Sequence, residues 1–215
     1  MIKVYYAFTD ILNSANIGAI TDQLPPDVSG RLTRMRKKED RQLLLLSRII
    51  LLKAFTENLS DRWSLNDIRY TDNGRPYLCG GKSDFSISHS GNCAAVVVSD
   101  DCRVGIDLET IKETDFSDFS DFFSAEQWSD IYSAQDPNER FYRYWTLTES
   151  AAKADGRGLS SISGRSIKLN TGFLNIDDDD TRWFYNHYSF GGRIVCCIAS
   201  DRNAEPEGIQ KVISI

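Results

Sequence analysis

The chain has 215 residues and a formal net charge of −6, with 41% hydrophobic and 26% charged residues. This length suits one large domain or two small ones, and the acidic balance argues against general nucleic-acid binding. The longest apolar stretches, Cys93–Val98 and Ile194–Ala199, are too short for a transmembrane helix or a signal peptide, so we expect no membrane association.

The first half is predicted to hold one long helix among short strands. Lys3–Phe8 is a β-branched and aromatic run, typical of a strand. A helix is predicted from Arg31 to about Leu59, because apolar residues recur there at helical spacing. The strands that follow, separated by turn signals, are predicted at Ile68–Thr71, Pro76–Cys79, Phe85–Ser88, Ala94–Val98 and Val104–Leu108.

The second half is predicted to begin with two helices. Ser124 is a plausible N-cap for the first, and Asp136 followed by Pro137 opens the second, which Gly156 and Gly158 end. Asp177–Asp180 reads as a loop tip. Further strands are predicted at Ser166–Leu169, Trp183–Phe190, Ile194–Ala199 and Gln210–Ile213.

The predicted fold class is α+β, because links between successive strands are too short for parallel crossovers and favour antiparallel neighbours. Both halves follow a helix-then-strands order, yet they share no residue-level repeat, so a duplication is a suspicion only. We place the boundary at residue 105, giving an N-terminal half at 1–105 and a C-terminal half at 106–215.

Charge divides at the same boundary. Residues 1–105 carry 14 basic and 12 acidic side chains, whereas residues 106–215 carry 11 basic and 19 acidic ones. Within the first half, Arg31–Arg41 holds six basic residues against two acidic ones. That patch is either solvated surface or a site for a small ligand rich in phosphate.

Five cysteines are present, two of them adjacent, without a Cys-x-x-Cys pair, and there are only two histidines. These numbers make a structural zinc site improbable and favour a reduced, cytoplasmic protein.

Asp107 and Glu109 lie two apart on a predicted strand, so both project from one face. Two carboxylates that close repel each other unless a cation or protons intervene, and Mg²⁺ is the natural cation for them. The alternative is a strand that emerges into solvent with two exposed acids.

The helix that starts at Asp136 carries Tyr142, Trp145, Glu149 and Lys153 on one face. The pattern fits either a functional stripe or an amphipathic helix with a surface Glu–Lys pair. Arg157, between two glycines at the helix end, favours close approach of a ligand.

Ser88 and His89 lie where a predicted strand runs into a turn, and Arg75 lies in a tight turn. Adjacent strand residues point to opposite faces, so these two are an unlikely nucleophile pair. His89 is suited to donating to a phosphate, although a histidine satisfied within the turn is the alternative. Arg75 taken alone would be an ordinary exposed arginine.

Taken in order, several blocks resemble the 4′-phosphopantetheinyl transferases of the long, surfactin-synthetase-activating type. The blocks are Gly74-Arg75-Pro76, Phe85-Ser86-Ile87-Ser88-His89-Ser90, Gly105-Ile106-Asp107-Leu108-Glu109, Phe123-Ser124-Ala125-Glu126 and Trp145-Thr146-Leu147-Thr148-Glu149-Ser150-Ala151-Ala152-Lys153. The Gly156-Arg157-Gly158-Leu159 ending also fits. Any one block is weak evidence, whereas five in the right order are strong.

This resemblance implies a pseudo-dimer of two similar α+β halves and a specific reaction. The family moves the 4′-phosphopantetheine arm of coenzyme A to a serine of an apo carrier protein and releases adenosine 3′,5′-bisphosphate. The implied metal ligands for Mg²⁺ are Asp107, Glu109 and Glu149, and the implied catalytic residues are Glu149 and Lys153.

The resemblance also implies coenzyme A contacts in the first half. Arg75, Ser88 and His89 match such positions, and we expect Arg31 and Arg34 of the basic patch to join them. The general base is left open between Glu149 and a metal-bound water, with Glu126 a weaker candidate.

Two departures from the family pattern stand out. Thr148 replaces the usual Lys before the metal-binding Glu, and Leu43 and Leu44 replace the usual Arg and Thr or Ser. Thr148 is the one feature that favours a catalytically inactive binding module for coenzyme A or a carrier protein.

A second alternative is a Mg²⁺-dependent phosphatase of the haloacid-dehalogenase type. Ile106–Thr110 loosely resembles the nucleophile motif of that family. In that fold the motif lies on a strand of a parallel sheet.

We expect the protein to be a monomer. The sequence does not identify the carrier protein that is modified.

Overall fold

The computed structural model describes residues 1–58, 63–159, 169, 172–175 and 182–213. These residues form two compact units, one made of residues 1–102 and 206–215 and the other of residues 103–205. The predicted boundary at residue 105 falls inside a strand, and the last ten residues belong with the first unit. The predictions at Ser166–Leu169 and Asp177–Asp180 lie wholly or mostly outside the described residues.

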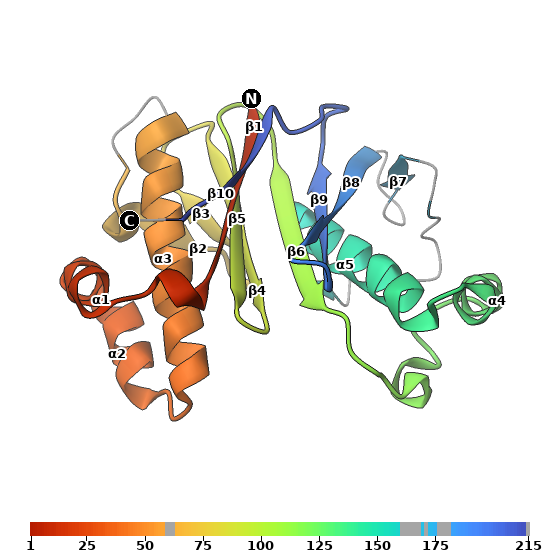
Figure 1. The fold of residues 1–215 in the computed structure, drawn as a ribbon. Helices are drawn as coiled ribbons and strands as arrows, with labels where there is room; N and C mark the ends of the chain where they lie inside the picture. The colour runs from red at the N-terminus through yellow and green to blue at the C-terminus, as the bar shows by residue number, and fades with distance from the viewer. Residues whose placement is uncertain (59–62, 160–168, 170–171, 176–181, 214–215) are drawn as a thin grey trace. The chain divides into compact units, whose positions relative to one another are not determined.

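The first unit is a mixed α+β layer in which helices cover a sheet (Figure 1). Its sheet has the strand order β10-β1-β5-β4, and a separate pair joins β2 to β3. The elements are β1 (Ile2–Phe8), η1 (Thr9–Ile11), α1 (Ser14–Thr21), α2 (Pro26–Arg34), α3 (Lys38–Asn58), η2 (Leu65–Asp67), β2 (Ile68–Tyr70), β3 (Pro76–Leu78), β4 (Asp84–Ser90), β5 (Cys93–Ser99) and β10 (Gly208–Lys211).

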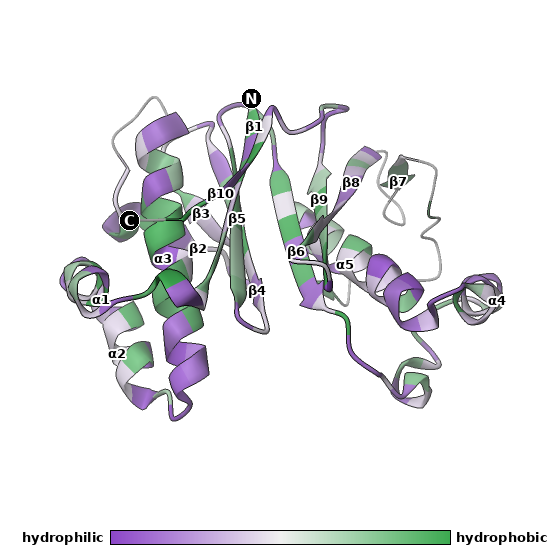
Figure 2. Ribbon diagram, in the orientation of Figure 1, coloured by the Kyte–Doolittle hydropathy of each residue, from purple (hydrophilic) through white to green (hydrophobic). Residues whose placement is uncertain are grey.

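Helix α3 forms the centre of this unit and packs against β1, β4 and β5. Leu43, Leu46, Ile50 and Ala54, which recur in the sequence at helical spacing, are all buried, and this confirms the spacing argument. Figure 2 shows the hydrophobic middle of α3 between hydrophilic ends. Ile50 and Ala54 are among the residues of one hydrophobic core shared with the sheet.

The single helix predicted from Arg31 to about Leu59 is wrong, because α2 and α3 are separate. Residues 33–42 hold one apolar side chain, Met35, so little burial is available there to hold a continuous helix. Arg34 and Lys38 would also repel each other at the i,i+4 spacing. Met35 adopts an extended backbone with ψ 125 and ends α2.

Helix α1 was not predicted. Its N-cap is Asn13, whose side chain accepts hydrogen bonds from the backbone N–H groups of Ala15 and Asn16. The Asn16 side chain bonds back to the Asn13 N–H and completes a capping box. The usual sequence signature has Ser or Thr followed by Glu or Gln, so this pair of asparagines is easily overlooked.

The second unit places one long helix along a four-stranded antiparallel sheet with the order β6-β9-β8-β7. Helix α5 packs on β6, β8 and β9, and α4 packs on α5. The elements are β6 (Val104–Thr110), η3 (Phe116–Phe119), α4 (Ala125–Ser133), α5 (Pro137–Asp155), β7 (Phe173–Asn175), β8 (Arg182–Phe190) and β9 (Ile194–Ser200).

Both predicted helix starts in this unit are confirmed. The Ser124 side chain accepts from the Gln127 N–H in a capping box, and the Asp136 side chain accepts from the Glu139 N–H. Gly156, in the left-handed conformation with φ 82, ends α5 as expected. The short strand β7 was not predicted.

The α+β class with mainly antiparallel sheets is confirmed, and each unit sets a long helix on a four-stranded sheet. One exception concerns β10, which pairs with β1 in parallel. The Val212 N–H donates to the Tyr6 carbonyl just beyond this strand, which holds the end of the segment beside β1.

Helix α5 and strand β6 touch at Gly105 without any side chain between them. A Cβ atom at this position would lie 2.0 Å from the Ser150 carbonyl oxygen and 2.6 Å from the Ala154 nitrogen. Both atoms belong to the helix backbone and cannot rotate away. The glycine therefore sets how closely α5 approaches the sheet.

We expect Gly105→Ala to lower the free energy of unfolding by about 3 kcal/mol, because the helix must be pushed off the sheet. Chemical denaturation followed by circular dichroism measures this. The matched control is Gly30→Ala in α2, where a Cβ meets nothing within 4 Å and the better helix propensity should stabilise by up to about 1 kcal/mol. Equal stability of the two variants would contradict the close-contact argument.

Candidate active site

Strand β6 presents two carboxylates on the face that carries Gly105. Asp107 is 4% exposed, and Glu109 is half-buried near the end of the strand. Asp107 lies opposite Cys197 of β9, which belongs to the core beneath α5. Ile106 and Leu108 are fully buried on the other face. The alternative of an exposed strand with two solvated acids is therefore wrong for Asp107.

Helix α5 brings a cation to these acids. Lys153 Nζ lies 2.6 Å from Asp107 Oδ1, in an ion pair between helix and strand. Glu149 lies one turn before Lys153 and is half-buried. The surface Glu–Lys pair considered from the sequence is therefore replaced by a contact to a different element. Asp107 Oδ2 is enclosed away from solvent.

The neighbouring charged residues change the pKa of Glu149. Its pKa is raised above the usual value, chiefly by burial, then by the charge of Asp107, with a smaller contribution from Glu109. Lys153 acts in the opposite direction. Three carboxylates facing one lysine form a site with excess negative charge, which suits a hard divalent cation.

The donor set matches the metal ligands implied by the resemblance, but the carboxylates are not pre-arranged around a point. Within the part of the chain that the structure describes, no group of three or more His, Cys, Asp or Glu side chains is positioned to hold a metal ion. Lys153 engages Asp107 instead. The chemistry of the donors fits Mg²⁺, and the side chains would have to adjust on binding.

The other residues of the predicted stripe on α5 have structural roles. The Tyr142 hydroxyl lies 2.9 Å from Thr114 Oγ1, and Trp145 contacts the rings of Phe119 and Phe122. Thr148 is buried and donates to the Tyr144 carbonyl. The aromatic end of the stripe therefore packs in the hydrophobic core, and only the end with Glu149 and Lys153 is polar.

Arg75 lies in the turn between β2 and β3 and is far from an ordinary exposed arginine. Its Nη2 is 2.5 Å from Asp84 Oδ2, and the two side chains are 13% and 10% exposed. The Thr71 hydroxyl accepts from the Arg75 N–H and holds the turn. Asp84 was not predicted as part of any site, because sequence separation hides this pairing.

Ser88 and His89 follow on β4 with opposite exposure. Ser88 is buried and His89 is exposed, as expected for adjacent residues on two faces of a strand. Arg31 and Arg34 are exposed on α2. These four residues and Arg75 belong to the first unit, whereas Asp107, Glu109, Glu149 and Lys153 belong to the second.

The remaining candidates are more peripheral. Glu126 is exposed in the first turn of α4. Arg157 is exposed, and its Nε lies 2.7 Å from the buried carboxylate of Asp155. Leu43 and Leu44 are buried on α3, where they serve packing.

Both units match models of one family. The model of the 4′-phosphopantetheinyl transferase superfamily matches residues 103–199. The model of the N-terminal part of 4′-phosphopantetheinyl transferases matches residues 13–101.

Curated relatives carry the same name. The 4′-phosphopantetheinyl transferases ffp of Bacillus subtilis and psf-1 of Bacillus pumilus are 28% and 27% identical to this chain. The alignments cover 89% and 97% of this chain, and 90% and 94% of those relatives. The L-aminoadipate-semialdehyde dehydrogenase-phosphopantetheinyl transferase of Xenopus laevis is 28% identical over 74% of this chain, which spans 62% of that protein.

We expect Lys153→Met to lower the free energy of unfolding by about 2 kcal/mol in metal-free buffer, because it removes the ammonium group that pairs with the buried Asp107 carboxylate. The matched control is Lys53→Met, which breaks an exposed pair with Glu57 at 2.5 Å and should cost under about 0.5 kcal/mol. Urea denaturation compares them. A Lys153 variant no less stable than the control would mean that the ion pair does not hold α5 to β6.

Proposed function

The chain belongs to the 4′-phosphopantetheinyl transferase superfamily, and we propose that it transfers the 4′-phosphopantetheine arm of coenzyme A to a serine of an apo carrier protein. The organisation in two α+β units suits the long, surfactin-synthetase-activating type. The observation that carries the proposal is the contact between Asp107 and Lys153, with Glu149 and Glu109 beside it.

In this reaction the serine Oγ attacks the β-phosphorus of coenzyme A. The bond from that phosphorus to the bridging oxygen breaks, and adenosine 3′,5′-bisphosphate leaves with the electron pair. The serine proton must go to a base, and the charge developing on the pyrophosphate must be offset. The site residues supply both a base and a cation.

Asp107, Glu109 and Glu149 would hold Mg²⁺, and Lys153 would bind the pyrophosphate oxygens. When bound, the metal neutralises the pyrophosphate and the leaving phosphate. Lys153 acts as a point charge that can turn from Asp107 to the substrate, since its side chain is 32% exposed. The serine proton would go either to Glu149 or to a metal-bound water.

The first unit would contact the coenzyme A phosphates through Arg31, Arg34, Arg75, Ser88 and His89. Arg31, Arg34 and His89 are exposed. The ion pair with Asp84 fixes the position of the Arg75 guanidinium, a group whose planar geometry suits a phosphate.

The alternatives are less well supported. A haloacid-dehalogenase phosphatase expects its motif on a strand of a parallel sheet, whereas β6 pairs with β9 in antiparallel register. An inactive binding module rests on Thr148 alone, and that residue is buried with its hydroxyl bonded to the helix backbone. No observation favours either alternative over the transferase.

We further propose a cytoplasmic monomer. All the residues of the acidic site come from one unit of one chain, so the site needs no second copy. All five cysteines are thiols that form no disulfide, which suits a reducing compartment. Among the described residues, no helix has the length and apolar character needed to cross a membrane.

Incubation with coenzyme A, Mg²⁺ and a panel of apo carrier proteins should add one phosphopantetheine group to at least one carrier, measured by intact mass. Asp107→Asn should lower kcat by at least about 100-fold, because it removes a charged ligand from the site. The matched control is Asp118→Asn, an exposed acid of the same unit, which should keep normal turnover. Near-normal turnover of the Asp107 variant would contradict the assignment.

Removal of divalent metal with a chelator should abolish transfer, and added Mg²⁺ should restore it, because the excess carboxylate charge otherwise repels the pyrophosphate. Initial rates against free Mg²⁺ concentration measure this dependence. Full activity in excess chelator would rule out the proposed metal role while leaving the transferase assignment intact.

A further inference from the structure

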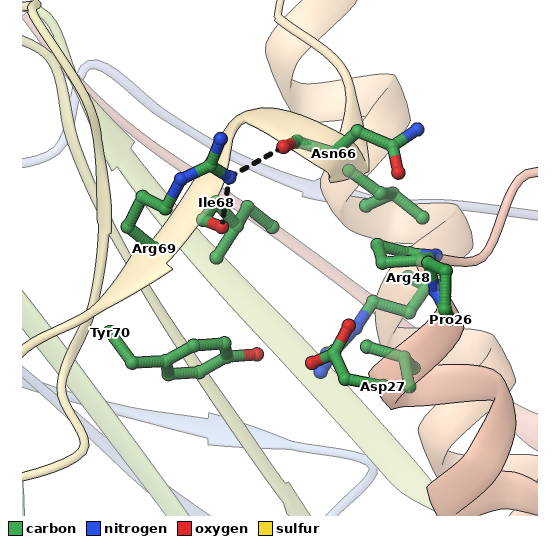
Figure 3. Close-up of a pocket in the computed structure, with 10 residues that line it drawn as sticks. Pro26, Asp27, Arg48, Asn66, Ile68, Arg69 and Tyr70 are labelled. Carbon is green, nitrogen blue, oxygen red and sulfur yellow. Dashed lines mark hydrogen bonds between the residues drawn. The ribbon is translucent and has the colours of Figure 1, made fainter.

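A second polar site lies within the first unit, between α2, α3 and the η2–β2 segment (Figure 3). A cavity of about 210 Å³ opens there. Val28, Leu65 and Ile68 give it apolar walls, and the charged or polar groups around it include Arg48 and Tyr70. None of these residues was assigned a function from the sequence.

Arg48 is a half-buried cation whose charge is poorly balanced. Its Nη1 lies 3.2 Å from the Ser47 hydroxyl, a neutral acceptor. Among the described carboxylates, none forms an ion pair with Arg48. Its pKa is lowered, chiefly by burial, and the charge of Arg31 acts in the same direction. A half-buried cation that no described carboxylate approaches to ion-pair distance is costly, and a bound anion would offset that cost.

Two neighbours support binding of an anion at Arg48. Figure 3 shows the side-chain ends of Arg48, Asp27 and Tyr70 directed toward one another. The Tyr70 hydroxyl also lines the cavity and can donate a hydrogen bond to a ligand oxygen. Asp27 supplies a longer-range attraction for Arg48 and would oppose an anion.

The start of α2 adds a further favourable field. Residues 25–28 line the cavity, and the N-cap Pro25 provides no side-chain hydrogen bond to the first turn. The first N–H groups of a helix have no partner within the helix, and its N-terminal end carries partial positive charge. A planar guanidinium beside such an end is a common way to bind a phosphate group.

We propose that this cavity binds a phosphate group, with Arg48 as its anchor and Tyr70 as a second donor. The apolar walls formed by Val28, Leu65 and Ile68 leave room for the organic part of a phosphate monoester. The bound group is either free phosphate or a phosphate carried by a larger molecule such as coenzyme A.

The test is a calorimetric titration of inorganic phosphate at constant ionic strength into the wild-type chain and Arg48→Gln. Loss of a charge-assisted hydrogen bond should weaken binding at least about tenfold. The matched control is Arg69→Gln, since the Arg69 Nη1 donates to the Asn66 and Ile68 carbonyls at 2.7 and 3.0 Å. That variant removes equal charge from the same cavity and should weaken binding less than about threefold.

Unchanged binding in Arg48→Gln, or an equal loss in both variants, would overturn the proposal. Should Arg48→Gln not fold, as judged by circular dichroism, Asp27→Asn decides the matter. Removing that repulsive carboxylate should tighten phosphate binding about threefold or more. Unchanged or weaker binding in Asp27→Asn would overturn the proposal.

Competition identifies the source of the phosphate. Displacement by coenzyme A but not by dephospho-coenzyme A, which lacks the 3′-phosphate, would assign the cavity to that phosphate. Displacement by neither would assign it to a separate phosphate ligand. The titrations need no carrier protein and no transfer, so their failure is distinct from failure of the proposed function.

Discussion

The direct backbone contact between α5 and β6 at Gly105 is the constraint on which the acidic site depends. Ser150 and Ala154 lie against the glycine, so the helix residues before each of them, Glu149 and Lys153, are carried to the strand. Asp107 lies two residues after this glycine on β6 and on the same face of the strand. Because Gly105 has no side chain, helix α5 packs closely enough on β6 for the Lys153 ammonium group to reach the Asp107 carboxylate.

Patterns local to a few residues predicted most of the fold. The caps at Ser124 and Asp136 were confirmed because residues within a single helical turn decide them. The break between α2 and α3 was missed because the helical spacing of apolar residues does not show where a helix loses its contact with the core. The partner of Arg75 and the environment of Arg48 depend on which segments fold together, which a single sequence does not show.

The two units manage charge differently. In the first unit, Arg75 is paired with a buried carboxylate at 2.5 Å, while Arg48 has no ion pair among the described residues. In the second unit the excess is negative, and Lys153 offsets part of it beside Glu149 and Asp107. The uneven charge along the sequence thus produces two kinds of site, one with excess positive charge at Arg48 and one with excess negative charge around Asp107. Most of the exposed acids form solvated surface.

The parallel pairing of β10 with β1 makes the second unit an insertion within the first, since the chain leaves at residue 102 and returns at 206. During synthesis on the ribosome, the first sheet cannot gain its last strand until the whole inserted unit has been translated. The inserted unit has no such dependence, because all its strands are contiguous in sequence. The order in which the polypeptide emerges therefore favours completion of the inserted unit before completion of the first unit.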